Sequence, residues 1–190
     1  MKETLQKSYK LSTGHFQGVE IHKLKRISVK GGDVQHYLKS TDPGFLEFGE
    51  IYFSRVDFKE VKAWKRHRKM TLNLAVPVGE VKFVFLNNFD NTFKQILIGE
   101  SAYVRLTVSP GVWFGFQGLT KPTSLVASLI NTPHDPEEID RKERDSIGFK
   151  SLCSIIQTEL ELLASRTGKL GNGVKLIGRE HIDKAISEGK

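Results

Sequence analysis

The stretch TLNLAVPVGEVKFV, residues 71–84, contains two short apolar runs on either side of Val78-Gly79-Glu80. Both runs are rich in β-branched and aromatic residues, which fit the pleated surface of a sheet. Gly79 can adopt the positive φ that a tight turn between strands requires. The stretch therefore predicts two strands, over residues 70–78 and 81–86, joined by a turn.

The same pattern continues on both sides of this hairpin. Further runs of β-forming residues occupy 19–27, 45–56, 103–108, 112–116 and 124–130. Turn-forming residues lie between runs, at Gly31-Gly32, Asp42-Pro43-Gly44, Ser109-Pro110-Gly111 and Lys121-Pro122. Short strands at this spacing, with no helical pattern between them, favour an antiparallel sandwich or barrel over a parallel α/β sheet. We therefore expect an all-β fold.

The chain changes character after Pro133. Residues 135–138, DPEE, are a typical helix start, because aspartate can cap, proline suits the first turn and carboxylates favour the positive end of the helix dipole. Apolar side chains recur at helical spacing over 151–165, and residues 179–187 can form a last short helix. We predict a β domain over 1–145 and a helical C-terminal extension over 146–190, which acts as a docking appendage or an oligomer contact.

Composition narrows the class of protein. The 190 residues are 38% hydrophobic and 27% charged, which excludes a disordered, collagen-like or coiled-coil chain. Lys and Arg exceed Asp and Glu by 29 to 22, so the net charge of +7 favours an anionic partner without identifying it. Cys153 is the only cysteine, which favours a reducing compartment. The sequence shows neither a signal peptide nor an apolar run long enough to span a bilayer, so we expect a cytoplasmic protein without a membrane partner.

Residues 50–55, EIYFSR, alternate with a period of two. Glu50, Tyr52 and Ser54 share one face of the predicted strand, and Ile51 and Phe53 share the other. The polar and aromatic face lines a ligand pocket if it points into a barrel, and it faces water if the strand belongs to the surface of a sandwich. Alternation alone leaves both interpretations open.

Residues 62–70, KAWKRHRKM, form the densest group of candidate functional side chains, since six of these nine residues are basic or histidine. A solvated basic turn is one interpretation. The run continues into the predicted strand 70–78, however, so alternate side chains should point inward, where cations need an anion such as a diphosphate. His67 is the only histidine in this run, so we expect no metal site. No nucleic-acid-binding module accompanies the cations, so we expect no nucleic-acid partner.

Two further segments carry motifs. In residues 110–118, PGVWFGFQG, aromatics alternate with glycine, which indicates a strand approached closely by a ligand or another backbone, and equally a packed barrel end. In residues 131–136, NTPHDP, His134 and Asp135 are neighbours. Adjacent residues in a turn seldom form a catalytic dyad, and Asp135 is better suited to cap a helix.

Taken together and in this order, the segments 50–54, 61–79, 109–118 and 125–136 resemble the dTDP-4-dehydrorhamnose 3,5-epimerase-like branch of the cupins (RmlC-like), which includes dTDP-sugar ketoisomerases. The resemblance spans about residues 15–145. It implies a jelly-roll β-barrel that forms a homodimer and binds a nucleotide-diphosphate sugar at its open end. Basic residues would contact the diphosphate and aromatic residues would lie near the base. The resemblance also implies proton abstraction next to a sugar ketone, in deoxysugar and cell-surface polysaccharide biosynthesis.

This chain departs from the family's catalytic pattern. The position of the epimerase histidine is Lys65, and that of the proton-returning tyrosine falls near Ala127. The second histidine of the ketoisomerase His-x-His pair is retained as His67, and Lys69 is a loose match to the lysine that stabilises the enolate. The candidate catalytic residues are therefore His67, Lys65, Lys69 and Tyr52. The candidate substrate contacts are Glu50, Ser54, Trp64, Arg66, Asn73, Trp113 and Phe116.

We accordingly expect a nucleotide-sugar epimerase or isomerase that uses no cofactor. Because the usual histidine and tyrosine are replaced, a non-catalytic sugar-nucleotide-binding or scaffold cupin remains an alternative. A cupin that uses a metal for another reaction is a third.

Overall fold

A computed structural model describes residues 16–88 and 90–147. The chain divides into two units, Met1–Arg144 and Asp145–Lys190, and the second contributes only its first three residues to the described part. The helices predicted over 151–165 and 179–187, Cys153, and nearly all of the predicted C-terminal extension lie outside the described residues. Within the described residues, no helix is long and apolar enough to cross a membrane.

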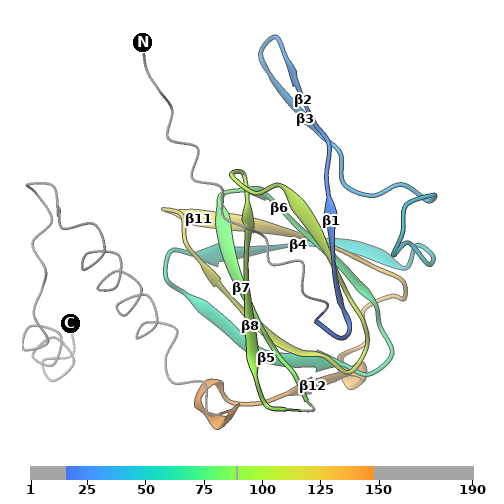
Figure 1. Ribbon diagram of the computed structural model, residues 1–190, viewed down its shortest axis with the longest axis vertical. Coiled ribbons are helices and arrows are strands. Elements are labelled where there is room, and N and C mark those ends of the chain that lie inside the picture. Colours follow the sequence, from blue (N-terminus) through green and yellow to red (C-terminus); the bar gives the residue numbers. More distant parts are fainter. Residues whose placement is uncertain (1–15, 89, 148–190) are drawn as a thin grey trace, which may run out of the picture. The chain divides into compact units, whose positions relative to one another are not determined.

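The β domain consists of two five-stranded sheets and a separate hairpin (Figure 1). Sheet I has the order β1 (Val19–Lys23), β9 (Val104–Val108), β6 (Leu72–Val78), β11 (Thr123–Ile130) and β4 (Glu50–Asp57). Sheet II has the order β12 (Ile139–Arg141), β5 (Val61–His67), β10 (Trp113–Gly118), β7 (Glu80–Leu86) and β8 (Phe93–Gly99). All neighbouring strands are antiparallel. The all-β prediction is confirmed.

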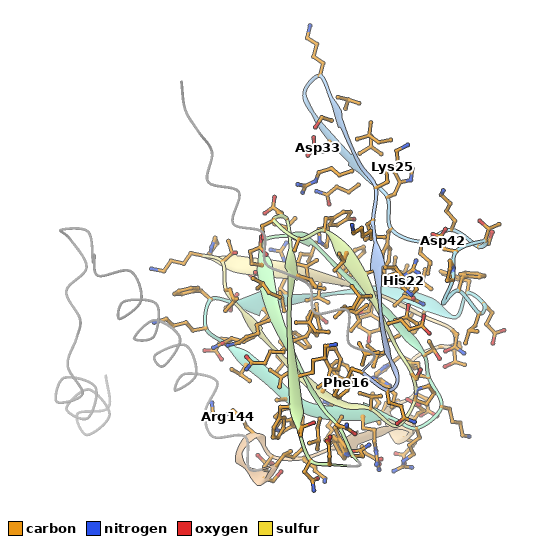
Figure 2. The ribbon with its side chains drawn as sticks, viewed as in Figure 1. Phe16, His22, Lys25, Asp33, Asp42 and Arg144 are labelled. Atoms are coloured by element: carbon orange, nitrogen blue, oxygen red, sulfur yellow. The ribbon has the colours of Figure 1, made fainter. Side chains whose placement is uncertain are left out.

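The separate hairpin consists of β2 (Arg26–Val29) and β3 (Gly32–Gln35) and projects from the two sheets. Lys25 and Asp33 mark it in Figure 2, and its Val29 and Val34 side chains are exposed. The predicted run over 19–27 is thus divided between β1, which pairs with β9, and β2, which belongs to the hairpin.

The core lies between the sheets and is built around four phenylalanines. The ring of Phe83 lies 6.2 Å from that of Phe85 and 5.3 Å from that of Phe116, and the rings of Phe85 and Phe114 are 6.0 Å apart. Sheet I packs against them with buried aliphatic side chains, among them Leu72, Leu74, Val76, Leu106 and Val126. Inward and outward side chains alternate along a strand, so each core residue shows which face of its own strand points inward.

The hairpin predicted over 70–86 is present as β6 and β7, with Gly79 at a φ of 77° in the turn. The prediction over 45–56 started too early, since β4 begins only at Glu50. The basic run is a strand of its own, β5, and does not continue into β6 as expected, because residues 68–71 separate the two. β3, β8 and β12 were not predicted.

The helix start predicted at 135–138 is a single 3-10 turn, Pro136–Glu138. Its predicted cap is confirmed, since the carboxylate of Asp135 accepts the backbone N–H of Glu137 at 2.9 Å. The chain then enters β12, which pairs with β5, and a second 3-10 turn spans Arg144–Ile147. The first 3-10 turn therefore leads directly into β12, at the edge of sheet II beside β5.

Candidate active site

The polar face of β4 points into the domain. Tyr52 packs against the core, whereas Ile51 and Phe53 on the other face are 42% and 61% exposed. Glu50 and Ser54 share the side of Tyr52, since residues two apart in a strand point the same way. Over residues 50–54 the strand is thus polar toward the interior and apolar toward the outside. Of the two interpretations that the sequence left open, this is the one in which the polar face lines the interior.

Two side chains of β5, on the opposite sheet, also point toward the core. The Nζ atom of Lys65 lies 5.1 Å from the ring centroid of Phe114 and 5.8 Å from that of Phe116. The imidazole of His67 stacks on Phe114 at 6.4 Å. Since both phenylalanines belong to the core, Lys65 and His67 point inward. The expectation that alternate side chains of the basic run point inward is confirmed.

His67 is oriented by a buried carboxylate. Its Nδ1 atom lies 2.8 Å from Oε2 of Glu138, and the histidine is only 2% exposed. The other oxygen of Glu138 accepts the backbone N–H groups of Lys69 and Met70. A carboxylate so placed accepts hydrogen bonds, so Nδ1 of His67 carries the proton and donates. Nε2 is left with a lone pair and, among the described residues, has no hydrogen-bond partner.

Burial determines the protonation states of these groups. It lowers the pKa of His67, although hydrogen bonding to Glu138 opposes the shift, so the neutral imidazole dominates near pH 7. Burial alone would raise the pKa of Glu138, but the N–H groups of Lys69 and Met70, together with His67, bring it below its usual value. Burial raises the pKa of Tyr52, against a hydrogen bond with Ser128, so this phenol keeps its proton. The site thus pairs a neutral base with a protonated hydroxyl.

The segment between β11 and β12 adds His134 to this group of side chains. The backbone N–H of His134 donates to Oε2 of Glu50 at 2.8 Å, and its ring lies 6.3 Å from that of Tyr52, edge to face. His134 is also close enough to lower the pKa of His67. We refer to Tyr52, Lys65, His67, Ser128, His134 and Glu138 as the relay cluster. Ser128, His134 and Glu138 were not among the sequence-based candidates, although the stretch NTPHDPEEI, residues 131–139, contains two of them.

Gly115 on β10 allows β5 to approach closely. A Cβ atom at this position would lie 2.5 Å from Cβ of Ala63 and 3.2 Å from the carbonyl oxygen of Lys62. The register between the strands shifts here, with Phe114 opposite Lys65 and Phe116 opposite Lys62. Of the alternatives left open for this glycine, the structure shows the close approach of another backbone.

Several predicted site residues lie away from the relay cluster. Trp113 alternates with Phe114 and is therefore on the outer side of sheet II, where Arg66 and Lys142 lie 4.9 Å and 4.6 Å from its ring. Trp64 precedes the inward-facing Lys65, and its indole N–H donates to the carbonyl oxygen of Arg144. The structure does not bring these aromatics to Lys65 and His67.

Two other candidates, Arg66 and Asn73, form hydrogen bonds on the outer faces of the sheets. Arg66 and Arg68 both bind Asp140, whose pKa falls to about 2 because the guanidinium groups hydrogen-bond to its ionised form. Asn73 lies on the outer face of sheet I, donates to the carbonyl oxygen of Gly44 and accepts from the hydroxyl of Thr107. The side chain of Lys69 is exposed, and its backbone N–H joins the network instead. Phe116, in contrast, lies directly beneath Lys65.

No cluster of three or more potential metal ligands occurs among residues 16–88 and 90–147. The wall of a cavity of about 440 Å³ adjoins the end of β5, because the backbone N–H of Gly111 in this wall donates to the carbonyl oxygen of His67. The described residues in its walls carry no ionisable side chain; they are Gln17, Gly18, Leu86, Asn87, Asn88, Ser109, Pro110, Gly111 and Val112.

Comparison with known proteins connects this arrangement to a family. No protein-family model and no curated protein matches the chain. Among solved structures, a dTDP sugar isomerase from Desulfovibrio desulfuricans is 34% identical, with a TM-score of 0.67 over 73% of this chain and 96% of that protein. The sugar 3,4-ketoisomerase QdtA from Thermoanaerobacterium thermosaccharolyticum is 22% identical, with a TM-score of 0.58 over 70% of this chain and 95% of QdtA.

A dTDP-4-dehydrorhamnose 3,5-epimerase from Sulfolobus tokodaii shares the fold at 18% identity, with a TM-score of 0.61 over 69% of this chain and 80% of the epimerase. The isomerase match extends over nearly the whole of that protein at more than 30% identity. It agrees with the jelly-roll sheets and with the family resemblance carried by the motifs. The chain belongs to the RmlC-like cupins, the family of the dTDP-sugar isomerases and the dTDP-4-dehydrorhamnose 3,5-epimerases.

Proposed function

We propose that this protein is an isomerase or epimerase of a dTDP-4-keto-6-deoxy sugar. The observation that carries the proposal is the position of a neutral base and a protonated hydroxyl on opposing sheets. His67 and Lys65 extend from β5, and Tyr52 extends from β4. The substrate class is supported by the similarity to a dTDP sugar isomerase and to a ketoisomerase solved with TDP-4-keto-6-deoxyglucose.

The chemistry requires removal of a proton from a carbon next to a ketone. Such a base is most effective when its pKa is near the working pH and it is positioned, and positioned acids and bases typically contribute about 10²- to 10⁴-fold each. Glu138 positions His67, because it fixes Nδ1–H and leaves the Nε2 lone pair to accept the proton, and its hydrogen bond opposes the lowering of the pKa of His67 by burial. We therefore favour His67 over Lys65 as the base.

The product depends on where the proton returns. If His67 returns it to the neighbouring oxygen-bearing carbon, the ketone moves from C4 to C3 and the enzyme is a ketoisomerase. If Tyr52 delivers a proton from the opposite face, the configuration inverts and the enzyme is an epimerase. The hydrogen bond between Tyr52 and Ser128 supports either a donor or a binding role for the phenol.

The test is proton NMR of the full-length protein with dTDP-4-keto-6-deoxyglucose in deuterium oxide. We expect loss of the C3 proton signal through exchange with solvent, and a new sugar spectrum identifies the product. His67→Ala should lower the exchange rate by roughly 10²-fold or more. Thr92→Ala, an exposed change between β7 and β8, is the control and should leave it unchanged.

Each outcome distinguishes the alternatives. Binding without exchange at any ring carbon would overturn the enzyme proposal and favour the non-catalytic binding or scaffold cupin. Exchange that survives in His67→Ala would assign the base to another residue. Exchange that disappears when the protein is treated with a chelator and returns with added metal would favour the metal-dependent cupin.

We further propose that the protein forms a homodimer and acts in the cytoplasm, in deoxysugar and cell-surface polysaccharide biosynthesis. The dimer is supported by the apolar outer face of β4, an edge strand of sheet I, where Ile51 and Phe53 are exposed. Exposed apolar residues grouped on an edge are typical of contacts between subunits. A second copy can present the same face, as two-fold symmetry requires.

A further inference from the structure

Lys65 is an inward-facing lysine for which residues 16–88 and 90–147 provide no acidic partner. Its Nζ atom lies over the rings of Phe114 and Phe116, and within the described part of the chain no carboxylate is within ion-pair distance of it. The neighbouring cations differ in this respect, because Arg66 and Arg68 share Asp140 at 2.6 Å each. Inward-facing charges are ordinarily paired, so an unpaired amine indicates a use for the uncharged form.

The surroundings of this amine favour its neutral form. Burial lowers the pKa of Lys65 to about 8, and the charges of Arg141 and Lys62 contribute. Roughly a quarter of such an amine is unprotonated at pH 7.5, compared with about one part in a thousand for an ordinary lysine. A desolvated lysine beside other cations is the environment in which this residue becomes a nucleophile toward carbonyl carbon.

A base stands next to the amine on the same strand and the same face. His67 is two residues from Lys65, both point inward, and Nε2 of His67 has no protein partner among the described residues. A carbonyl carbon attached to Nζ would place its α-proton in the region that Nε2 faces. An amine and a base in this relation are the two groups needed for enamine chemistry on a ketone.

We propose that Lys65 is a covalent catalyst, whose amine condenses with the ring ketone of the substrate. This inference rests on the proposed function, since it requires a keto sugar. The neutral Nζ adds to the carbonyl carbon, and uptake of one proton with loss of water gives an iminium ion; the same proton is released when the iminium is hydrolysed. His67 Nε2 removes the α-proton, and the electron pair of the C–H bond forms an enamine. Reprotonation on the same α-carbon restores the iminium, with either configuration at that carbon, and one water then hydrolyses it. Hydrolysis releases the 4-keto sugar and restores the amine without net oxidation or reduction, so the covalent route serves epimerisation or proton exchange next to the ketone.

The iminium ion gives Lys65 a role that a fixed charge does not have. A positive nitrogen bonded to the carbon accepts the electron pair more readily than a neutral carbonyl does, as in other Schiff-base lysines. If Lys65 acted only as a cation near the enolate oxygen, an arginine would replace it at least in part. Lys65→Arg therefore separates covalent catalysis from electrostatic catalysis.

The experiment traps the iminium by reduction. The full-length protein is incubated with dTDP-4-keto-6-deoxyglucose and cyanoborohydride, and its intact mass is measured. Reduction replaces the carbonyl oxygen by the amine, so the expected gain is the mass of the substrate less one oxygen atom, located at Lys65 by peptide mapping. The adduct should form faster as the pH rises toward 8, because more of the amine is neutral. dTDP-glucose, which has no ketone, should give no adduct.

Variants complete the test. Lys65→Arg and Lys65→Gln should both lose the adduct and reduce solvent-proton exchange into the sugar by roughly 10²-fold or more. Lys62→Arg keeps the charge of an exposed lysine on the same strand and should retain adduct and exchange. Circular dichroism checks that each variant is folded.

The possible failures are distinguishable. Exchange in the native protein without any adduct, or with an adduct at another lysine, would overturn covalent catalysis and leave the proposed function standing. Full exchange in Lys65→Arg would do the same. Absence of both exchange and adduct in the native protein would overturn the covalent role and the proposed function together.

Discussion

At the scale of the residue, a carboxylate far away in the sequence determines the protonation of His67. Glu138 reaches it across 71 positions of the chain and also accepts two backbone N–H groups from the turn after β5. The carboxylate therefore fixes the tautomer of the imidazole and the position of the strand end that carries it. Removal of its charge should affect catalysis more than folding.

Glu138→Gln tests this arrangement. The amide oxygen can still accept the N–H groups of Lys69 and Met70, while the charge that raises the pKa of His67 is lost. We expect the pKa of His67 to fall further, which makes it a weaker base, and the exchange rate to fall by roughly 10²- to 10⁴-fold. Histidine NMR titration measures the first effect and deuterium exchange the second.

The neighbouring glutamate provides a matched control. Glu137 is exposed and its side chain is not part of the relay cluster, so Glu137→Gln should change neither quantity. An unchanged histidine pKa and an unchanged rate in Glu138→Gln would refute the positioning role. A loss of rate in Glu138→Gln with an unaltered histidine titration would indicate a purely structural role.

At the scale of the element, the placement of Lys65 depends on how closely β5 lies against β10. The shift in register between Phe114 and Phe116 occurs at Gly115, where a side chain would meet Ala63. Strand β5 is thereby held where Lys65 lies above both phenylalanines. The close packing of β5 against β10 thus determines the position of Lys65, a candidate catalytic residue.

Gly115→Ala should displace β5. Its Cβ atom would lie 2.5 Å from Cβ of Ala63, and overpacking of this kind typically costs about 1–3 kcal/mol. We expect a corresponding decrease in the free energy of unfolding in urea, together with slower solvent-proton exchange because Lys65 and His67 move with the strand. Adding Ala63→Gly removes the clashing methyl group and should restore part of both losses. If Gly115→Ala equals the native protein in both measurements, β5 is not constrained by this contact.

At the scale of the whole molecule, the two faces of sheet I have different roles. The inner face of β4 presents Tyr52 to the relay cluster, and the outer face presents Ile51 and Phe53 to the surroundings. A single strand therefore connects the interior chemistry with the surface that we propose to form the dimer.

Phe53→Glu should separate the subunits. A charge introduced at a self-complementary contact faces its own copy across the two-fold axis and must also lose its hydration. Light scattering after size exclusion should give the mass of a dimer for the native protein and that of a monomer for Phe53→Glu, with unchanged far-ultraviolet circular dichroism. Gln95→Glu, an exposed position on β8 of sheet II, is the charge-matched control and should remain dimeric. A dimeric Phe53→Glu, or a monomeric native protein, would contradict the proposed interface.

Local patterns were sufficient for the features that depend on neighbours in the chain. The strands β6 and β7, the glycine turn between them, the polar stripe on β4 and the cap at Asp135 were all predicted from short stretches. Strand β5 was harder to recognise, because consecutive basic residues conceal the alternation of inward and outward side chains. The outward positions of Trp64, Trp113 and Asn73 were missed because residue type alone does not say to which side of a sheet a side chain points.

By itself, the sequence determined an all-β domain, the inward-pointing cations of the basic run and membership of a family, since strand alternation, turn chemistry and ordered motifs are properties of short stretches. Only the tertiary structure decided that Glu138 orients His67, that Ser128 and Tyr52 share a hydrogen bond on sheet I, and that Lys65 lies over two phenylalanines, with no carboxylate of the described residues beside it. The physical reason is that these contacts join two sheets and a connecting segment. Their distances depend on how the sheets pack, and no local pattern in the chain records that.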